Sequence, residues 1–391
     1  MERIVLGLPD LTIQSIASAR PLILEVVWTG KAECPHCGGT KLRIKDTFWR
    51  FIKSIRLHDR PSTLKIHCHK YHCLECGRYF NTRLPGVKKW GRATEVLKQS
   101  VFSVYNRGHS NKNIAEDNGI GVATVERFYH QMIVHKDSHF QNRMCPRILG
   151  IDEHRFTRKQ GFITTFCDLK KRKIFDVALG KDSSKLHDFL CNMDGRERVR
   201  VVCIDMNSGY RNLVKQYFPN ALIVSDRFHV IRLVNHHFGS IYKLLDEEHI
   251  AHGRGRLMRL LMTRQDRLTH EQRKKLHDYF AVQPAIQALY DFCHELNDLL
   301  RTKGKNRHDR AKCIPIFLQR IKQLKESPFK AMQTLGTTLA CWKEEVARMF
   351  RFVKNNGITE GFHRKMKLIQ RRAYGFRNFE NYRLRVRVLC G

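Results

Sequence analysis

Two long segments in the N-terminal part of the chain alternate between hydrophobic and polar residues. They are KLRIKDTFWRFIKSIRL, residues 41–57, and TLKIHCHKYHC, residues 63–73. Successive side chains of a β-strand point to opposite faces of a sheet, so this period of two predicts a strand in each segment. Because only a short interval separates the segments, we expect the two strands to form a hairpin.

The spacing of hydrophobic residues becomes helical from residue 92 onward. Gly108 would end a first helix, and Ser110 would cap the next one. Two shorter helices then meet at a turn that contains glycine, packed through Ile114, Ala115, Val122, Val125 and Phe128. This arrangement predicts a helix-turn-helix whose second helix enters a DNA major groove. An ordinary helical hairpin is the alternative.

The start of the second helix would then face DNA. The residues expected there are Ala123, Thr124, Glu126 and Arg127.

Three apolar runs in the middle of the chain end in aspartate: RILGID at Asp152, RVVCID at Asp205 and ALIVSD at Asp226. After the first run, GFITTFCDL and KIFDVALG predict a hairpin across a basic turn at residues 170–172. SSKLHDFLCNM predicts a helix capped by Ser183 or Ser184. SGYRNLVKQYF predicts a further helix, and a long helix begins after the third run. The order β-β-β-α-β-α-β-α predicts a mixed sheet with helices on its faces.

The stretch from residue 247 to 351 has apolar residues at helical spacing with Lys and Arg between them. It predicts a helical segment whose basic residues face DNA. Solvated helix faces are the alternative explanation for many of these charges.

In a sheet of this kind, ligand sites lie beyond the carboxyl ends of the strands, where the three aspartates are expected. Clustered carboxylates repel one another unless a cation holds them together. Hard oxygen ligands suit Mg²⁺ or Mn²⁺, and two such ions ~4 Å apart can assist phosphoryl transfer. The alternative is that each aspartate only caps the loop or helix that follows it.

The charge of the chain favours a polyanionic partner. It contains 72 Lys and Arg against 37 Asp and Glu, a formal net charge of +35 with a pI near 10.0. Such a balance is the usual electrostatic signature of nucleic-acid binding. A generally basic protein, for example one bound to ribosomes, is the alternative.

Hydropathy predicts neither a membrane helix, which needs ~20 apolar residues, nor a signal peptide in MERIVLGLPDL. We therefore expect a protein of the reducing cytosol. There, its 13 cysteines would be thiols or metal ligands rather than disulfides.

Four of these cysteines form two Cys-x-x-Cys pairs, each followed by glycine. The pairs are Cys34 with Cys37 in CPHCGG and Cys73 with Cys76 in CLECGRYF. Two such pairs predict a tetrahedral site for a structural Zn²⁺, with no open position for chemistry. The neighbouring residues His67, Cys68, His69 and His72 are alternative ligands, and we place Cys68 outside the site.

The cysteine motifs, the helix-turn-helix, GIDEHRF, VVCIDM, SDRFHVIRLVN and the closing block at residues 359–386 occur in this order. From about residue 22 to its end, the chain resembles bacterial insertion-sequence transposases of the ISL-three family. The closing block is the most specific part. The resemblance implies a zinc-binding domain, a ribonuclease-H-like core and an Asp-Asp-Glu metal site. The implied reaction is hydrolysis at the transposon ends, followed by joining of the 3′-hydroxyls to target DNA.

Residue by residue, the family's first aspartate matches Asp152 in GIDE, its second Asp205 in CIDM, and its glutamate Glu360 in ITEGF. The second aspartate of a ribonuclease-H-like core follows the fourth strand, and RVVCID is the fourth strand predicted here. These three residues would hold Mg²⁺ or Mn²⁺ and are the expected catalytic residues.

The segment DRFH, with Asp226 and His229, resembles the D-x-x-H signature of related transposases with a helical insertion. It implies a supporting role, which is to position the scissile phosphate or the flanking strand. A histidine on a helix face is the alternative for His229. Glu153 could support the metal ligands, although strand alternation points it to the opposite side.

Glu360 opens a strongly basic segment, so a helix N-cap is the alternative to a metal ligand. The basic residues that would hold the phosphodiester backbone are Arg364, Lys365, Lys367, Arg371 and Arg372.

The predicted fold class is multidomain α/β, with a ribonuclease-H-like mixed-sheet core that an α-helical insertion interrupts. A β-rich zinc ribbon and a helix-turn-helix precede this core. The expected ranges are a zinc ribbon at 1–88, a helix-turn-helix at 89–145, a catalytic core at 146–249 and 351–391, and an insertion at 250–350.

The predicted function is that of a DDE transposase in the bacterial cytoplasm, associated with the nucleoid and without a membrane partner. Its partner would be double-stranded DNA, both transposon ends and target. Pairing two ends would require a homodimer or higher oligomer. The alternatives are a non-catalytic repressor derived from a transposase and a metal-dependent nuclease without strand transfer.

Overall fold

The computed structural model describes residues 8, 10–140, 143–247, 256–302, 307–352 and 357–391. The chain divides into two compact units, Met1–His139 and Phe140–Gly391. Each unit has its own hydrophobic core. The expected boundary between catalytic core and insertion, at residues 249–250, lies outside the described residues.

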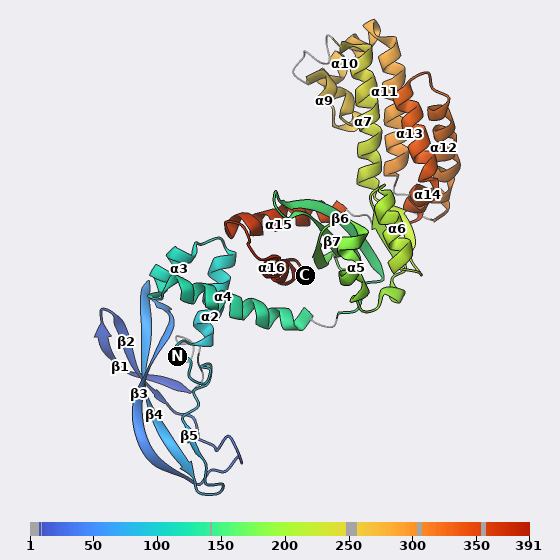
Figure 1. Cartoon of the computed structure of the whole chain (residues 1–391). Helices are drawn as coiled ribbons and strands as arrows, with labels where there is room; N and C mark the ends of the chain where they lie inside the picture. Colours follow the sequence, from blue (N-terminus) through green and yellow to red (C-terminus); the bar gives the residue numbers. More distant parts are fainter. Residues whose placement is uncertain (1–7, 9, 141–142, 248–255, 303–306, 353–356) are drawn as a thin grey trace. The chain divides into compact units, whose positions relative to one another are not determined.

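A five-stranded mixed sheet forms much of the first unit (Figure 1). Its strands are β1 (Leu11–Ala19), β2 (Leu22–Trp28), β3 (Leu42–Leu57), β4 (Arg60–Cys73) and β5 (Tyr79–Asn81). The predicted hairpin of β3 and β4 is confirmed. The order is β1-β2-β4-β3 with β5 on β4, and β2 runs parallel to β4. Ile52, Leu64 and Ile66 on one face of the hairpin are fully buried.

Three helices follow in this unit: α2 (Glu95–Asn106), α3 (Asn111–Asn118) and α4 (Val122–Asp137). Ser110 caps α3 as predicted, by accepting a hydrogen bond from a backbone N–H. Gly119 ends α3 with a left-handed φ of 58°, a conformation that glycine adopts without steric cost. Val125 belongs to the buried stripe of α4 as expected. Val122 does not, because it precedes that stripe at the start of the helix and is 44% exposed.

The second unit contains another five-stranded mixed sheet, in the order β10-β9-β6-β7-β8. Its strands are β6 (Ile148–Thr157), β7 (Gly161–Asp168), β8 (Lys173–Leu179), β9 (Val201–Ile204) and β10 (Leu222–Ser225). The helices between and after them are α5 (Ser183–Cys191), α6 (Ser208–Tyr217) and α7 (Arg227–Leu245). The predicted order of elements is confirmed. β6, β9 and β10 run parallel, whereas β7 and β8 are antiparallel to their neighbours.

Two local predictions need correction. Asp182, not Ser183 or Ser184, occupies the N-cap position of α5. Asp152 does not end its strand, because β7 continues to pair with β6 as far as Thr157.

Helices cover both faces of this second sheet. On one face, α15 (Gly357–Arg372) and α16 (Phe379–Cys390) bury Met366 and Tyr382 against Ile163. On the other face, Leu149 and Ile151 belong to a core shared with α5, α6 and α7. The C-terminal helices therefore return to the sheet after a long excursion of the chain.

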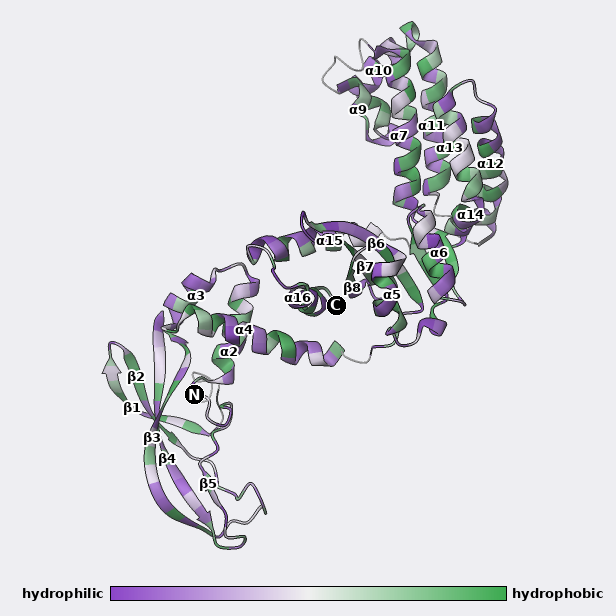
Figure 2. Ribbon diagram, in the orientation of Figure 1, coloured by the Kyte–Doolittle hydropathy of each residue, from purple (hydrophilic) through white to green (hydrophobic). Residues whose placement is uncertain are grey.

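That excursion is helical in its described parts, as predicted (Figure 1). The helices are α9 (Arg256–Met262), α10 (His270–Val282), α11 (Pro284–Arg301), α12 (Arg307–Lys325), α13 (Lys330–Cys341) and α14 (Lys343–Arg351). Short 3-10 helices lie at Ser138–Phe140, Arg196–Arg198 and Gln265–Arg267. Helices α9 to α14 carry both hydrophobic and hydrophilic residues (Figure 2). Every helix within the described ranges is too short or too polar to span a membrane.

Candidate active site

Three aspartates lie near one edge of the second sheet. The pairing of β6 with β9 places Asp152 level with Asp205, directly after the last residue of β9. The pairing of β10 with β9 places Asp226 at the same level. The predicted gathering of these carboxylates therefore follows from the register of three parallel strands.

A histidine from the C-terminal part of the chain lies against this edge. The Nδ1 atom of His363, on α15, lies 4.0 Å from Oδ2 of Asp152, and its Nε2 atom lies 3.3 Å from Oγ1 of Thr165. The rings of His363 and His154 pack with their centroids 4.2 Å apart. α15 thus covers the same sheet face that carries Asp152.

Burial makes this edge a costly place for negative charge. It raises the pKa of Asp152 to about 6, a shift that the nearby carboxylates of Asp205 and Asp226 increase and His229 opposes. Burial also raises the pKa of Asp205. A cation at this edge would offset the cost of keeping both groups ionised.

Asp226 and His229 form a hydrogen-bonded pair one helical turn apart. Nδ1 of His229 donates to Oδ2 of Asp226 at 2.9 Å, and the Asp226 side chain is only 2% exposed. Although burial lowers the pKa of His229, the bond and the three neighbouring aspartates outweigh it and raise the pKa. The three carboxylates therefore favour the protonated form of His229.

Glu360 lies in the first turn of α15, three residues before His363. Its side chain is 53% exposed, and Oε1 accepts a hydrogen bond from Arg364 at 2.7 Å. Within the part of the chain that the structure describes, Asp152, Asp205 and Glu360 do not form a group close enough to hold one metal ion. The structure thus brings the helix of Glu360 to the aspartates, but not its carboxylate.

The two aspartates nevertheless offer suitable ligands for a hard cation. Oδ1 of Asp205 is buried and has no hydrogen-bond partner among the described residues. The Asp152 side chain is only 16% exposed. A buried carboxylate oxygen without a donor is a site that Mg²⁺ or Mn²⁺ would satisfy.

Glu153 follows Asp152 but belongs to the opposite side of the strand. It lies beside Thr164 in the sheet, and Thr164 contacts the hydroxyl of Tyr210. Burial raises the pKa of Tyr210, and the Glu153 carboxylate raises it further. Glu153 therefore lies on the sheet face opposite Asp152 and not with the three aspartates.

The four predicted zinc ligands come together at the end of the first unit's hairpin. Their sulfur atoms lie within 4.8 Å of one another, with Cys34 to Cys76 and Cys37 to Cys73 at 3.6 Å. Tetrahedral Zn²⁺ with Zn–S bonds of about 2.3 Å places its sulfurs about 3.8 Å apart, so the donor set fits zinc.

The two glycines of this cluster permit its turns. Gly38 and Gly77 have φ values of 77° and 71°, and each donates a backbone hydrogen bond to the first cysteine of its pair. Cys68 lies elsewhere, fully buried in the core of the sheet. The neighbouring histidines are also outside the group of four.

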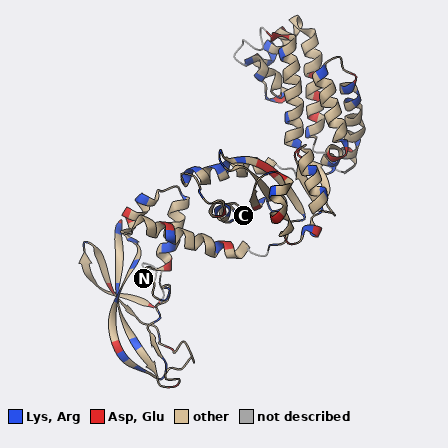
Figure 3. Ribbon diagram, in the orientation of Figure 1, with Lys and Arg blue, Asp and Glu red and all other residues tan. Residues whose placement is uncertain are grey.

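Many of the predicted DNA-contacting residues are exposed. At the start of α4, Ala123 and Arg127 are exposed and Thr124 is half-buried. Lys and Arg recur along the ribbon of α15 (Figure 3). Those exposed on this helix are Arg364, Lys365, Lys367, Arg371 and Arg372.

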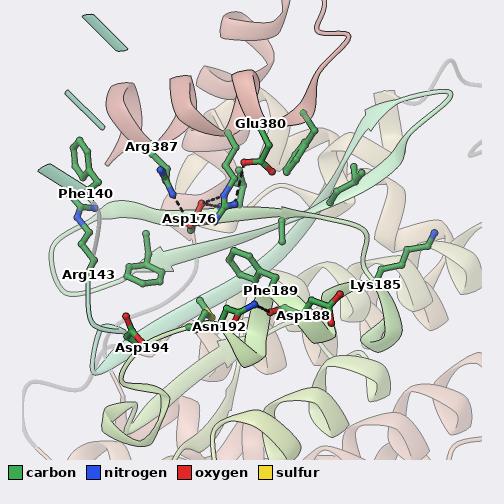
Figure 4. Close-up of a pocket in the computed structure, with 17 residues that line it drawn as sticks. Phe140, Arg143, Asp176, Lys185, Asp188, Phe189, Asn192, Asp194, Glu380 and Arg387 are labelled. Atoms are coloured by element: carbon green, nitrogen blue, oxygen red, sulfur yellow. Dashed lines mark hydrogen bonds and ion pairs between the residues drawn. The ribbon is translucent and has the colours of Figure 1, made fainter. Parts of the chain in front are cut away.

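A separate cavity of about 620 Å³ lies at the edge strand β8 (Figure 4). There, Arg383 of α16 donates two hydrogen bonds to Asp176, at 2.7 and 2.9 Å, and Arg387 approaches the same carboxylate. Basic and acidic side chains line the cavity together. The ion pairs fasten α16 to the sheet, and none of the predicted catalytic residues lies there.

Sequence reasoning missed His363, which contacts the predicted catalytic aspartate. Its only signal in the sequence is its position three residues after Glu360, a spacing that puts both side chains on one helix face.

Comparison with known proteins adds a family relationship. The DDE_Tnp_ISL3 family model, described as a transposase, matches residues 149–386. The transposase for insertion sequence element IS1001 of Bordetella parapertussis is 21% identical over 363 residues. The aligned part covers 91% of this chain and 88% of that transposase. The matched residues include all three aspartates and Glu360.

Proposed function

Since the chain belongs to the ISL3 transposase family, we propose that it binds the terminal inverted repeats of an insertion sequence and catalyses Mg²⁺-dependent cleavage and strand transfer. The observation that carries this proposal is the alignment of Asp152 on β6 with Asp205 and Asp226, which directly follow the parallel strands β9 and β10. The orphaned buried oxygen of Asp205 supports a cation at that edge.

Asp152 and Asp205 would hold Mg²⁺ or Mn²⁺, and Glu360 would complete the site once DNA is bound. Bound there, such a cation supplies Lewis-acid activation of the attacking oxygen and charge stabilisation of the leaving oxygen. To bind the metal, the Glu360 carboxylate would break its ion pair with Arg364. The exposed pair between them is weak, so little free energy opposes the exchange.

The pair of Asp226 and His229 would position the scissile phosphate. Because Nδ1 of His229 is used by Asp226, Nε2 is the ring nitrogen available to a phosphate oxygen. The raised pKa of His229 favours the protonated ring, which attracts that oxygen.

The core would be ribonuclease-H-like, interrupted by the helical insertion at 250–350 and completed by residues 351–391. The antiparallel strands β6, β7 and β8, followed by the parallel strands β9 and β10, support this assignment. Asp205 follows the fourth of these strands, as the resemblance implies.

The zinc ribbon at 1–88 and the helix-turn-helix at 89–145 would recognise double-stranded transposon ends. Arg127 and its neighbours at the start of α4 would read bases, and the basic residues of α15 would hold the backbone near the metal site. Pairing of two ends requires at least a homodimer. We propose that the protein acts on the nucleoid.

The test is the replacement of the edge aspartates. Asp152→Asn and Asp205→Asn should reduce Mg²⁺-dependent nicking and joining of a labelled end oligonucleotide to the level measured without metal. Binding of the end in a mobility-shift assay should persist. Asp168→Asn is the matched control, because Asp168 ends β7 and its carboxylate accepts backbone hydrogen bonds from the turn that follows.

The same assays separate the alternatives. A repressor would bind ends without nicking them, and a nuclease would nick without joining. Full activity of either aspartate variant would refute the assignment of the metal site.

A further inference from the structure

The sheet of the first unit has one face that carries its core and one that is open. On the hairpin, the buried residues Ile52 and Leu64 point to the core. The cross-strand pairs Phe51 with Lys65, Trp49 with His67 and Thr47 with His69 alternate with these positions. Since strand neighbours alternate between faces, these pairs occupy the other side of the sheet. We call this side the open face.

Aromatic rings form a continuous row on the open face. Trp49 packs on His67 at a centroid distance of 4.8 Å, and His67 packs on His69 at 5.0 Å. The row then continues through Tyr71, at 5.7 Å from His69. Trp49 and Phe51 at the other end are 45% and 55% exposed, so their rings offer free surface.

Positively charged side chains lie beside these rings. The ammonium group of Lys65 lies 4.2 Å from the centre of the Trp49 ring and 3.3 Å from the carboxylate of Glu25. Lys53 lies on the same face two residues beyond Phe51. Residues 31–92 contain 15 Lys and Arg against 4 Asp and Glu, so the surrounding surface attracts a polyanion.

We propose that the open face binds unpaired DNA, with bases stacked on Trp49, Phe51 and His67 and the backbone held by Lys65 and Lys53. Every base has a flat face that can stack on an aromatic ring, and basic side chains beside such rings hold the phosphates. The choice of DNA over RNA rests on the proposed function, because cleavage at a transposon end frees a strand.

The chemistry of the face favours this occupant over two others. A second protein chain would cover apolar surface, but His67 and Lys65 lie directly across from the two exposed hydrophobic rings on the neighbouring strand. A duplex hides the faces of its bases inside the stack, so it could use the lysines but not the rings. Only unpaired bases engage both features.

The test measures binding by fluorescence anisotropy, with the full chain carrying Asp152→Asn to prevent cleavage. Trp49→Ala and Phe51→Ala should each weaken binding of a labelled single-stranded oligonucleotide about tenfold. Binding of the blunt duplex end should not change. Trp49→Phe, which keeps a ring, should restore most of the affinity. Ile16→Ala is the control, because Ile16 is an exposed hydrophobic residue on β1 of the same sheet.

Zinc content and circular dichroism of each variant report whether the unit is folded. Equal loss of single-strand and duplex binding in a folded variant would overturn the proposal, as would no loss at all. Tighter binding of an RNA of the same sequence would overturn the choice of DNA. Because the assay needs no catalysis, its outcome is independent of the metal-site test.

Discussion

At the residue scale, the edge of the second sheet combines buried carboxylates with two kinds of histidine. His229 gains a carboxylate partner, and its pKa rises. His363 and His154 lie in contact with each other, and burial lowers their pKa values to about 4 and about 3. The surroundings therefore favour the charged form of His229 and the neutral forms of His363 and His154, although all three lie around the aspartates.

A positioning role for His229 predicts a partial loss. His229→Asn should lower the rate of strand transfer about 10–100-fold, the range typical of residues that orient a metal site from outside. It should leave affinity for the transposon end unchanged. Single-turnover joining measures the rate, and a rate equal to that of the unaltered chain would contradict the role.

Acid stability tests the neutral state of His154, which is buried and has no hydrogen-bond partner at either ring nitrogen within the described structure. The unfolded chain would bind a proton below about pH 6.5 that folded His154 rejects, because burial and then His363 and Lys367 lower its pKa to about 3. The contribution of neutral His154 to the free energy of unfolding is full above pH 6.5. It is lost as the pH falls toward 3. The loss is at most about 1.4 kcal/mol per pH unit.

His154→Phe keeps an aromatic ring and removes this titration. Its free energy of unfolding in urea should therefore fall less steeply with acid than that of the unaltered chain. His277→Phe, at an exposed histidine, is the control. Identical slopes for all three proteins would contradict the prediction.

At the element scale, local sequence patterns predicted the strands and helices whose formation depends on neighbouring residues in the chain. The alternation at 41–73 predicted the hairpin, and the apolar runs predicted the order of the second sheet. The prediction omitted β1 and β2, which join the hairpin through the parallel pairing of β2 with β4. It also placed Asp152 at a strand end, because the extra length of β6 depends on pairing with β7. These features, like the contact of His363, arise from tertiary pairing.

Zinc should hold the end of the hairpin together. Cys37→Ser should abolish stoichiometric zinc and lower affinity for the transposon end, because a structural site contributes folding free energy directly. Cys191→Ser, at an exposed cysteine of the second unit, is the control. Zinc released by a thiol reagent can be measured with a colorimetric chelator. Unchanged end binding in a zinc-free variant would refute the role.

At the scale of the whole molecule, the two units have separate cores, so each should fold without the other. A chain of residues 140–391 should unfold cooperatively and retain Mg²⁺-dependent nicking of DNA at high concentration. It should lose preference for the transposon end over unrelated duplex. Competition binding with both duplexes measures this preference. An unchanged preference would contradict the proposal that the first unit recognises the transposon end.

We propose that Glu360 completes the metal site, although its carboxylate pairs with Arg364 in this structure. Glu344 is a matched control, because it forms the same pair with an arginine four residues later on α14. The decisive measurement is joining of a pre-cleaved, labelled transposon end to target DNA in Mg²⁺. If Glu360 holds the metal, Glu360→Gln abolishes joining while Glu344→Gln joins normally. Full joining by Glu360→Gln would contradict it.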